Sequence, residues 1–197
     1  MEALTRDTVA EACSREQFFD ELVRKSYRQS FSLACRLTGN VAEAQDLVQE
    51  SYVRAYRFFS RYDDSLPFTS WLYRIMANVN IDRARRRSRL KTMSLDQAGA
   101  DGATSWDLPD SERGTENAIF DRALDGPLQS GLMSLNHQFR TAVLLADVEC
   151  LGYEEIAEIM GTSVGTVRSR IHRGRRHLRN YLMRHHAAAY GSMANEL

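Results

Sequence analysis

The chain has 197 residues, of which 43% are hydrophobic and 26% are charged, as in an ordinary globular protein. Lys and Arg together number 26, and so do Asp and Glu, so the chain carries no formal net charge. No apolar stretch is long enough to cross a bilayer, and the N-terminus lacks the basic-then-apolar pattern of a signal peptide. We therefore expect a cytoplasmic protein without membrane insertion. Only three prolines and no alternating Val/Ile/Thr runs predict an all-α fold.

The charges are distributed unevenly along the chain. Residues 81–91 contain six basic residues and one acid, residues 92–125 contain eight acids and two arginines, and residues 168–184 contain seven arginines and no acid. The acidic segment is also rich in Gly and Ser and has no helical period, which is typical of a linker. The sequence therefore predicts two small helical domains, each with a basic patch, joined by a flexible acidic linker.

Three helices are predicted in the first half of the chain. The first, over residues 15–39, is expected to end at Gly39 and Asn40. The second, over residues 41–63, has apolar residues on one side and acidic and amide side chains on another. The third, over residues 67–89, begins with aromatic residues and ends in arginines. Aromatic rings stack on unpaired bases, amides read base edges and guanidinium groups hold phosphates, so this helix is expected to contact nucleic acid.

The second half of the chain is expected to contain a helix-turn-helix over residues 151–182, supported by helices over residues 118–135 and 137–149. Gly161 suits the left-handed residue that ends a helix, and Ser163 suits the N-cap of the next helix. In such a motif the second helix enters the major groove, where arginine can bind guanine O6 and N7 together. The face expected to read bases carries Arg168, Ser169, His172, Arg173 and Arg176. Ser163 and Thr166 stand at the helix N-terminus, where backbone N–H groups favour a phosphate.

Three segments, in this order, resemble the bacterial extracytoplasmic-function (ECF) sigma factors of the sigma-70 family: "AEAQDLVQESYVRAYRFF", "FTSWLYRIMANVNIDRARR" and "LGYEEIAEIMGTSVGTVRSRIHRGRRHL". The resemblance covers about residues 15 to 184. It implies a sigma-two domain at residues 1–91, a linker at 92–115, a sigma-four helix-turn-helix domain at 116–184 and a tail at 185–197.

The same resemblance implies a function. The chain would be a transcription initiation factor, not an enzyme, that binds core RNA polymerase, directs it to specific promoters and promotes strand opening. The implied partners are core polymerase, through the clamp helices of its largest subunit and its flap, promoter DNA, and an anti-sigma protein. No cofactor and no metal are implied. The acidic linker would either pass through the polymerase channel or serve only as a tether.

The resemblance also assigns roles to individual residues. The polymerase-docking residues would be Gln45, Asp46, Gln49 and Glu50. Asn78 would help capture a base flipped from the minus-ten element, and the other residues expected at that element are Phe68, Asn80, Arg83, Arg86 and Arg87. Arg168, Ser169, His172 and Arg173 match the positions that read the minus-thirty-five element. One departure is Leu135-Asn136-His137, where the family usually has a Leu-Pro pair, so we expect an altered turn there.

Two other classes of protein share some of these features. A stand-alone helix-turn-helix regulator would bind duplex DNA by itself, but its receiver or ligand domain would show alternating strands and helices, whereas residues 41–82 are predicted to be all helical. An enzyme would need paired carboxylates, an activated nucleophile, metal-ligand spacing or a phosphate loop, and the sequence has none of these motifs. The sequence therefore favours the sigma factor over both alternatives.

Overall fold

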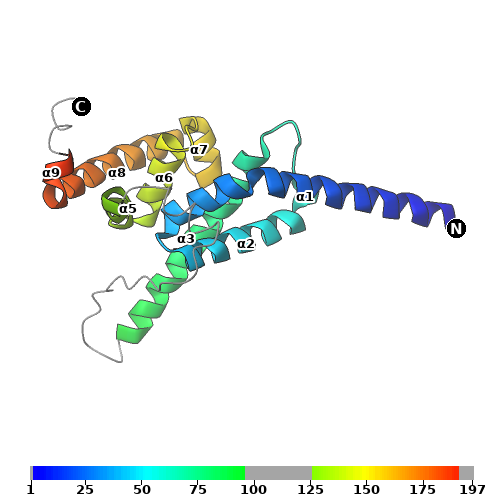
Figure 1. Cartoon of the computed structure of the whole chain (residues 1–197), viewed down its shortest axis with the longest axis horizontal. Coiled ribbons are helices and arrows are strands. Elements are labelled where there is room, and N and C mark those ends of the chain that lie inside the picture. The colour runs from blue at the N-terminus through cyan, green and yellow to red at the C-terminus, as the bar shows by residue number, and fades with distance from the viewer. Residues whose placement is uncertain (1, 96–125, 191–197) are drawn as a thin grey trace.

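The computed structural model describes residues 2–95 and 126–190 (Figure 1). Every regular element in these two ranges is a helix, which confirms the predicted all-α fold. Most of the predicted linker at 92–115, and the first part of the helix expected at 118–135, lie outside the described residues. No helix in the described ranges is long and apolar enough to span a membrane.

The N-terminal domain consists of α1 (Glu2–Thr38), α2 (Val41–Arg57), the short 3-10 helix η1 (Phe59–Arg61) and α3 (Phe68–Leu95). Gly39 has a φ of 73°, a left-handed conformation that glycine adopts readily, and it ends α1 where the sequence predicted. The side chain of Asn40 accepts a hydrogen bond of 3.1 Å from the backbone N–H of Glu43 and so caps α2. These two neighbouring signals turn the chain back on itself, and α2 packs along α1.

Two groups of apolar side chains hold the N-terminal domain together. Phe31, Leu47 and Leu72, from α1, α2 and α3, are 0% exposed and form its centre. At one end of α3, aromatic rings from α1, η1 and α3 pack at centroid distances of 4.9 to 6.5 Å, and several meet edge to face. The two groups fix the direction in which α3 leaves the domain.

The C-terminal domain consists of α5 (Gly126–Met133), α6 (His137–Asp147), α7 (Tyr153–Met160), α8 (Val164–His185) and α9 (Ala187–Tyr190). The turn in which the sequence has Leu135-Asn136-His137 leads from α5 into α6. The side chain of Asn136 accepts a hydrogen bond of 3.0 Å from the N–H of Gln138 and caps α6.

The two domains pack against each other, a contact that the sequence did not predict. Figure 1 shows α5, α6 and α7 beside the end of α1 and the first turns of α3. Arg140 of α6, 9% exposed, donates to the carbonyl of Leu37 at the end of α1 and to three carbonyls that follow α5 or end it. Burial lowers the pKa of Arg140 to about 10, so the guanidinium remains charged at neutral pH. One buried cation therefore closes the free carbonyl ends of two helices, one from each domain.

Candidate nucleic-acid interface

The turn between α7 and α8 has the predicted helix-turn-helix geometry. Gly161 ends α7 with φ 58° and ψ 46°, in the left-handed region. The Oγ atom of Ser163 accepts a hydrogen bond of 3.2 Å from the N–H of Thr166, which starts α8. The hydroxyl groups of the same two residues lie 2.9 Å apart. Both predicted caps are confirmed, and they leave the N-terminus of α8 at the surface.

One side of α8 faces the domain core. Val167, Ile171, Gly174 and Leu182 are buried there. A methyl group at Gly174 would lie 2.6 Å from Cγ2 of Val143, so α6 and α8 approach each other as closely as they do because this residue has no side chain. Gly174 was not among the residues predicted to matter, although it follows Val167 and Ile171 at helical spacing, which places it on the same side of the helix.

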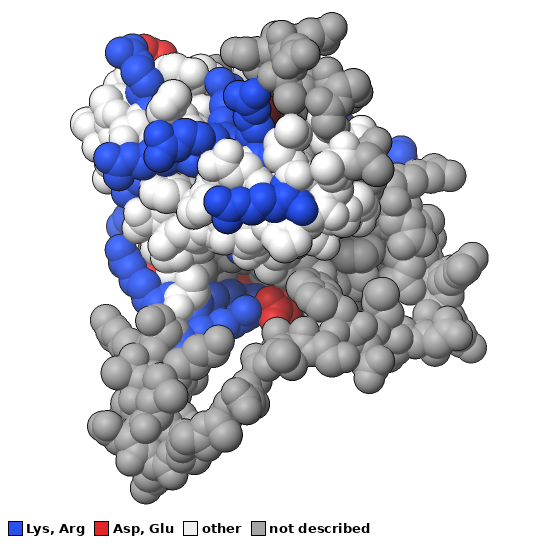
Figure 2. Space-filling model, turned by 90° about the vertical axis from the view of Figure 1, so that its left-hand side faces the viewer, with Lys and Arg blue, Asp and Glu red and all other residues white. Residues whose placement is uncertain are grey.

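The opposite side of α8 faces solvent and is basic. Arg168, His172, Arg173 and Arg176 are exposed, whereas Ser169 and Thr166 are half-buried. Figure 2 looks onto the end of the molecule that carries α8, and Lys and Arg side chains gather there with few acids among them. The predicted base-reading residues thus lie together on one accessible helix face, the geometry that a major groove admits.

Arg175 differs from its neighbours on α8. Its Nε donates a hydrogen bond of 3.1 Å to Oδ2 of Asp147, and its Nη2 donates to Oδ1 of the same carboxylate at the end of α6. The hydrogen bond to Asp147 raises the pKa of Arg175. This fork-to-fork pair ties α8 to α6 and sets the orientation of the basic face.

On α2, the predicted docking residues divide into two kinds. Asp46 and Gln49 are exposed, whereas Gln45 and Glu50 are half-buried. Glu50 is held from two sides, by Arg54 Nη2 at 2.6 Å from Oε1 and by Arg83 Nη2 at 2.8 Å from Oε2. Of the four residues, Asp46 and Gln49 are therefore the ones that present polar groups outward.

On α3, the predicted minus-ten residues are placed very differently from one another. Asn78 and Arg86 are exposed. Asn80 is half-buried, and its Nδ2 has no hydrogen-bond partner within the described residues. Phe68 is only 6% exposed and packs against Phe19, Tyr62 and Trp71, so in this structure its ring has no face free for a base, contrary to expectation.

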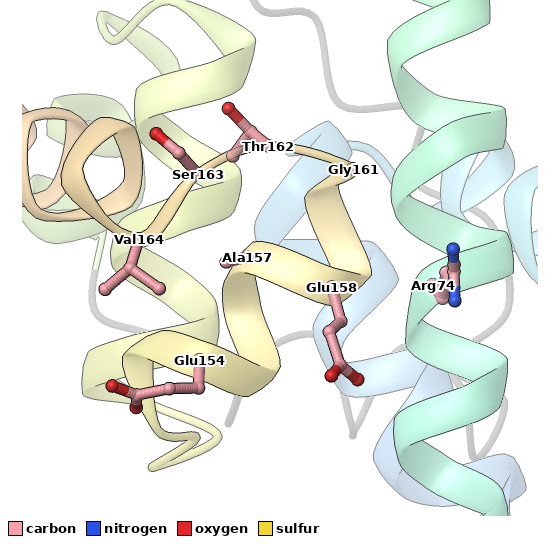
Figure 3. Close-up of a pocket in the computed structure, with 8 residues that line it drawn as sticks. All are labelled: Arg74, Glu154, Ala157, Glu158, Gly161, Thr162, Ser163 and Val164. Atoms are coloured by element: carbon pink, nitrogen blue, oxygen red, sulfur yellow. The ribbon is translucent and has the colours of Figure 1, made fainter.

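A cleft lies beside the contact between α3 and α7 and is lined by residues of both helices and of the turn that leads into α8 (Figure 3). Arg74 of α3 and Glu158 of α7 lie on its facing sides, and the turn that carries Thr162 and Ser163 forms one end. Arg74 precedes Asn78 by one helical turn, so the helix predicted to contact the minus-ten element and the start of α8 lie close to each other at the cleft. The two predicted DNA-reading elements are thus adjacent in this structure.

Comparison with known proteins identifies both halves. Residues 22–90 match the family model for sigma-70 region 2, and residues 127–178 match that for sigma-70 region 4. The chain is 42% identical over 168 residues to the ECF RNA polymerase sigma factor SigE of Mycolicibacterium smegmatis; the match covers 85% of this chain but only 62% of SigE. It is 36% identical over 159 residues to the ECF RNA polymerase sigma factor SigW of Bacillus subtilis, covering 77% of this chain and 82% of SigW.

Solved structures share the fold. The sigma factor RpoE of Bartonella quintana, in complex with the anti-sigma factor NepR, matches with a TM-score of 0.63 at 21% identity, over 84% of this chain and 97% of that one. CnrH, in complex with the cytosolic domain of CnrY, matches with a TM-score of 0.56 at 24% identity, over 86% and 90% of the two chains. From the two matched regions and the identity to SigW, the chain belongs to the ECF sigma factors of RNA polymerase.

Proposed function

We propose that this chain binds core RNA polymerase in the cytoplasm, directs it to specific promoters and promotes strand opening there. The basic outer face of α8 is the observation that carries the proposal, because its exposed arginines follow a capped helix-turn-helix and suit guanine edges. A stand-alone regulator would need only that motif. The chain also has a second domain that matches sigma-70 region 2, which favours a polymerase subunit.

The two domains would divide the work. Residues 1–91 would form the polymerase-binding and minus-ten domain, and residues 116–184 the minus-thirty-five domain, with 92–115 as linker and 185–197 as tail. Exposed Asp46 and Gln49 would lead the docking on polymerase, and exposed Asn78 the capture of a base. On α8 the reading face would comprise Arg168, Ser169, His172, Arg173 and Arg176, with Ser163 and Thr166 at a phosphate.

The packed arrangement of the domains has a consequence for promoter binding. The minus-ten and minus-thirty-five elements are separate stretches of the duplex. In the structure α3 packs directly on α7, which keeps the two proposed DNA-reading helices close to each other. The domains would therefore separate in the promoter complex, with polymerase holding each on its own surface and making the second DNA contact effectively intramolecular.

An anti-sigma protein would restrain this chain. RpoE and CnrH, which share its fold, were each solved in complex with another protein, named as an anti-sigma factor in the case of RpoE. A partner that bridges α3 and the helix-turn-helix would hold the two domains in the packed arrangement. Polymerase and the anti-sigma protein would then compete for the same chain.

Titration of labelled chain with purified core polymerase tests the docking assignment. Asp46→Lys should weaken core binding at least tenfold because it reverses the charge at the centre of the exposed face, while the far-ultraviolet circular dichroism stays unchanged. Asp20→Lys makes the same charge change at an exposed position of α1 and serves as the matched control. If both variants bound core polymerase with equal affinity, α2 would be excluded as the docking face.

A further inference from the structure

The arginine run near the end of α3 has two sides. Arg83 and Arg87 are one helical turn apart and face α2, where Arg87 Nη2 lies 2.7 Å from Oε2 of Glu43. Arg87 is itself exposed, as are Arg85 and Arg86 between them, for which the described residues show no ion pair. The run therefore does not present one uniform basic surface, although its sequence suggests that it does.

Arg83 makes the most extensive contact of the four. Its Nε and Nη2 lie 3.0 and 2.8 Å from Oε2 of Glu50. Its Nη2 also donates to the carbonyl of Asp46 at 2.9 Å, and its Nη1 to the carbonyl of Glu43 at 3.5 Å. All three guanidinium nitrogens are therefore engaged with α2, and the side chain is only 24% exposed.

Glu50 is fixed by the same network. Its other oxygen, Oε1, accepts a hydrogen bond of 2.6 Å from Arg54 on α2, and Arg54 lies 3.8 Å from Asp82 on α3. Partial burial alone would raise the pKa of Glu50, but the hydrogen bond from Arg83 and the charges of Arg54 and Arg83 outweigh it and lower the pKa. Because both of its oxygens accept hydrogen bonds, the Glu50 carboxylate is held in one orientation. Arg83 also binds the carbonyls of Glu43 and Asp46, in the backbone of α2 beside Glu50.

A phosphate contact by Arg83 would dismantle this network. Charge-assisted hydrogen bonds are the strong ones, and releasing Arg83 would leave half-buried Glu50 with one partner fewer. Arg86 can meet a phosphate without breaking any ion pair seen in the described residues. The free energy lost when Arg83 leaves Glu50 offsets the free energy gained from a contact with a surface phosphate. Arg86 can gain the same contact without that loss.

We propose that Arg83 is a positioning residue for polymerase docking, which holds Glu50 and the carbonyls of α2 so that Asp46 and Gln49 face outward in a fixed register. The phosphate contacts of this run belong instead to Arg85 and Arg86. The proposal rests on the proposed docking of α2 on core polymerase and adds a role for a residue that the resemblance assigned to DNA.

The test uses the full chain, purified core polymerase and two readouts: core affinity, and the slope of promoter binding by the holoenzyme against salt concentration. Arg83→Ala should weaken core binding about tenfold, and Glu50→Ala to a similar degree. The double variant should bind core polymerase no more weakly than the single variant with the lower affinity, because the two side chains act as a unit. Arg83→Lys should recover only part of the affinity, since lysine lacks the planar fork.

Arg86→Ala is the matched control one turn away. It should leave core affinity within about twofold and reduce the salt slope by about one, because one phosphate contact is lost, while Arg83→Ala leaves the slope unchanged. A reduced slope with normal core binding in Arg83→Ala would overturn the proposal. The proposal would also be overturned if the losses of core affinity in Arg83→Ala and Glu50→Ala multiplied in the double variant.

The failure of the docking face itself can be told apart. If Asp46→Lys weakens core binding and Arg83→Ala does not, only the positioning role of Arg83 falls. If Asp46→Lys leaves core binding unchanged, α2 is not the docking face and the role of Arg83 falls with it. Thermal melting of each variant shows that the affinities refer to folded protein.

Discussion

The hydroxyl of Tyr73, in α3, donates a hydrogen bond of 2.6 Å to Oε2 of Glu149, in the loop between α6 and α7. Gln29 Nε2 donates to the same oxygen at 3.1 Å, and Arg36 Nη1 lies 3.8 Å from Oε1. The Glu149 side chain is 4% exposed. Burial and the bond to Glu149 raise the pKa of Tyr73, so its hydroxyl keeps the proton that it donates. Three groups of the N-terminal domain thus hold one carboxylate of the C-terminal domain.

Replacing Glu149 should loosen the contact between the domains. Glu149→Ala removes the common acceptor and leaves the buried Tyr73 hydroxyl without the carboxylate to which it donates, at a cost of about 1–3 kcal/mol in the free energy of unfolding. Small-angle X-ray scattering should show a larger radius of gyration than for the wild type. Asp20→Ala, which removes an exposed carboxylate from α1, should change neither quantity. An unchanged radius in Glu149→Ala would mean that the other contacts suffice to hold the domains together.

Gly174 should be sensitive to a single methyl group. In Gly174→Ala the new carbon would lie 2.6 Å from Cγ2 of Val143 and 3.4 Å from the carbonyl oxygen of Phe139, so α6 and α8 must move apart. Overpacking of this kind costs about 1–3 kcal/mol. Gly165→Ala, in the same helix, meets no atom closer than Ser163 Oγ at 4.0 Å and should keep or raise the midpoint of thermal unfolding. Equal midpoints for the two variants would contradict the close packing at Gly174.

Stability should fall in mild acid because of His137. Burial lowers the pKa of His137 below its ordinary 6.5, and the charges of Arg140 on its own helix, Arg85 on α3 and Arg170 on α8 lower it further. The unfolded chain therefore binds a proton near pH 6 that the folded chain does not. His137 therefore leaves the free energy of unfolding unchanged above about pH 6.5. Below that, the free energy of unfolding decreases as the pH falls toward the pKa that His137 has in the folded chain.

Thermal melting at several pH values between 5 and 7 measures this effect. His137→Gln should flatten the loss of stability over that range, whereas His172→Gln, at an exposed position on α8, should keep the wild-type profile. If the wild type and His137→Gln lose stability in parallel, another group is responsible for the acid sensitivity.

Asn78 should matter for strand opening and not for assembly. Its exposed amide can donate to and accept from a base edge, and trapping a flipped base has to offset a few kcal/mol of unstacking. Asn78→Ala should spare core binding and the closed complex but reduce permanganate reactivity of the minus-ten region. Much of the defect should persist on a template with a pre-melted bubble, since base capture itself is lost. Normal opening by Asn78→Ala would exclude it from base capture.

Local signals predicted much of the fold and part of the site. Gly161, Ser163 and Asn40 act on the backbone within a few residues of themselves, so the sequence alone shows where their helices end or begin. The exposed face of α8 follows from helical periodicity in the same way. The predicted turn without proline is capped by Asn136, which is again a local interaction.

Contacts between distant residues were beyond such reasoning. Nothing near Glu149 or Arg140 in the sequence shows that each is buried against the other domain, and charged residues are ordinarily expected at the surface. Phe68 illustrates the same difficulty, since an aromatic residue at the start of a basic helix suits both base stacking and a core. Arg83 and Arg86 belong to one run, and only the position of α2 distinguishes them.

We propose that the chain directs initiation to specific promoters and that α8 reads the minus-thirty-five element. Run-off transcription with purified core polymerase is the most direct test of this proposal. A pool of genomic promoter fragments is transcribed with core alone, with core and the wild-type chain, and with core and Arg168→Ala. Discrete transcripts are expected only when the chain is present. For Arg168→Ala, we expect a loss of about 1–3 kcal/mol in discrimination at one minus-thirty-five position, while other positions stay selective. Transcripts that are the same with and without the chain would contradict the account, and an equal loss by Arg168→Ala on intact and altered minus-thirty-five elements would contradict base reading by α8.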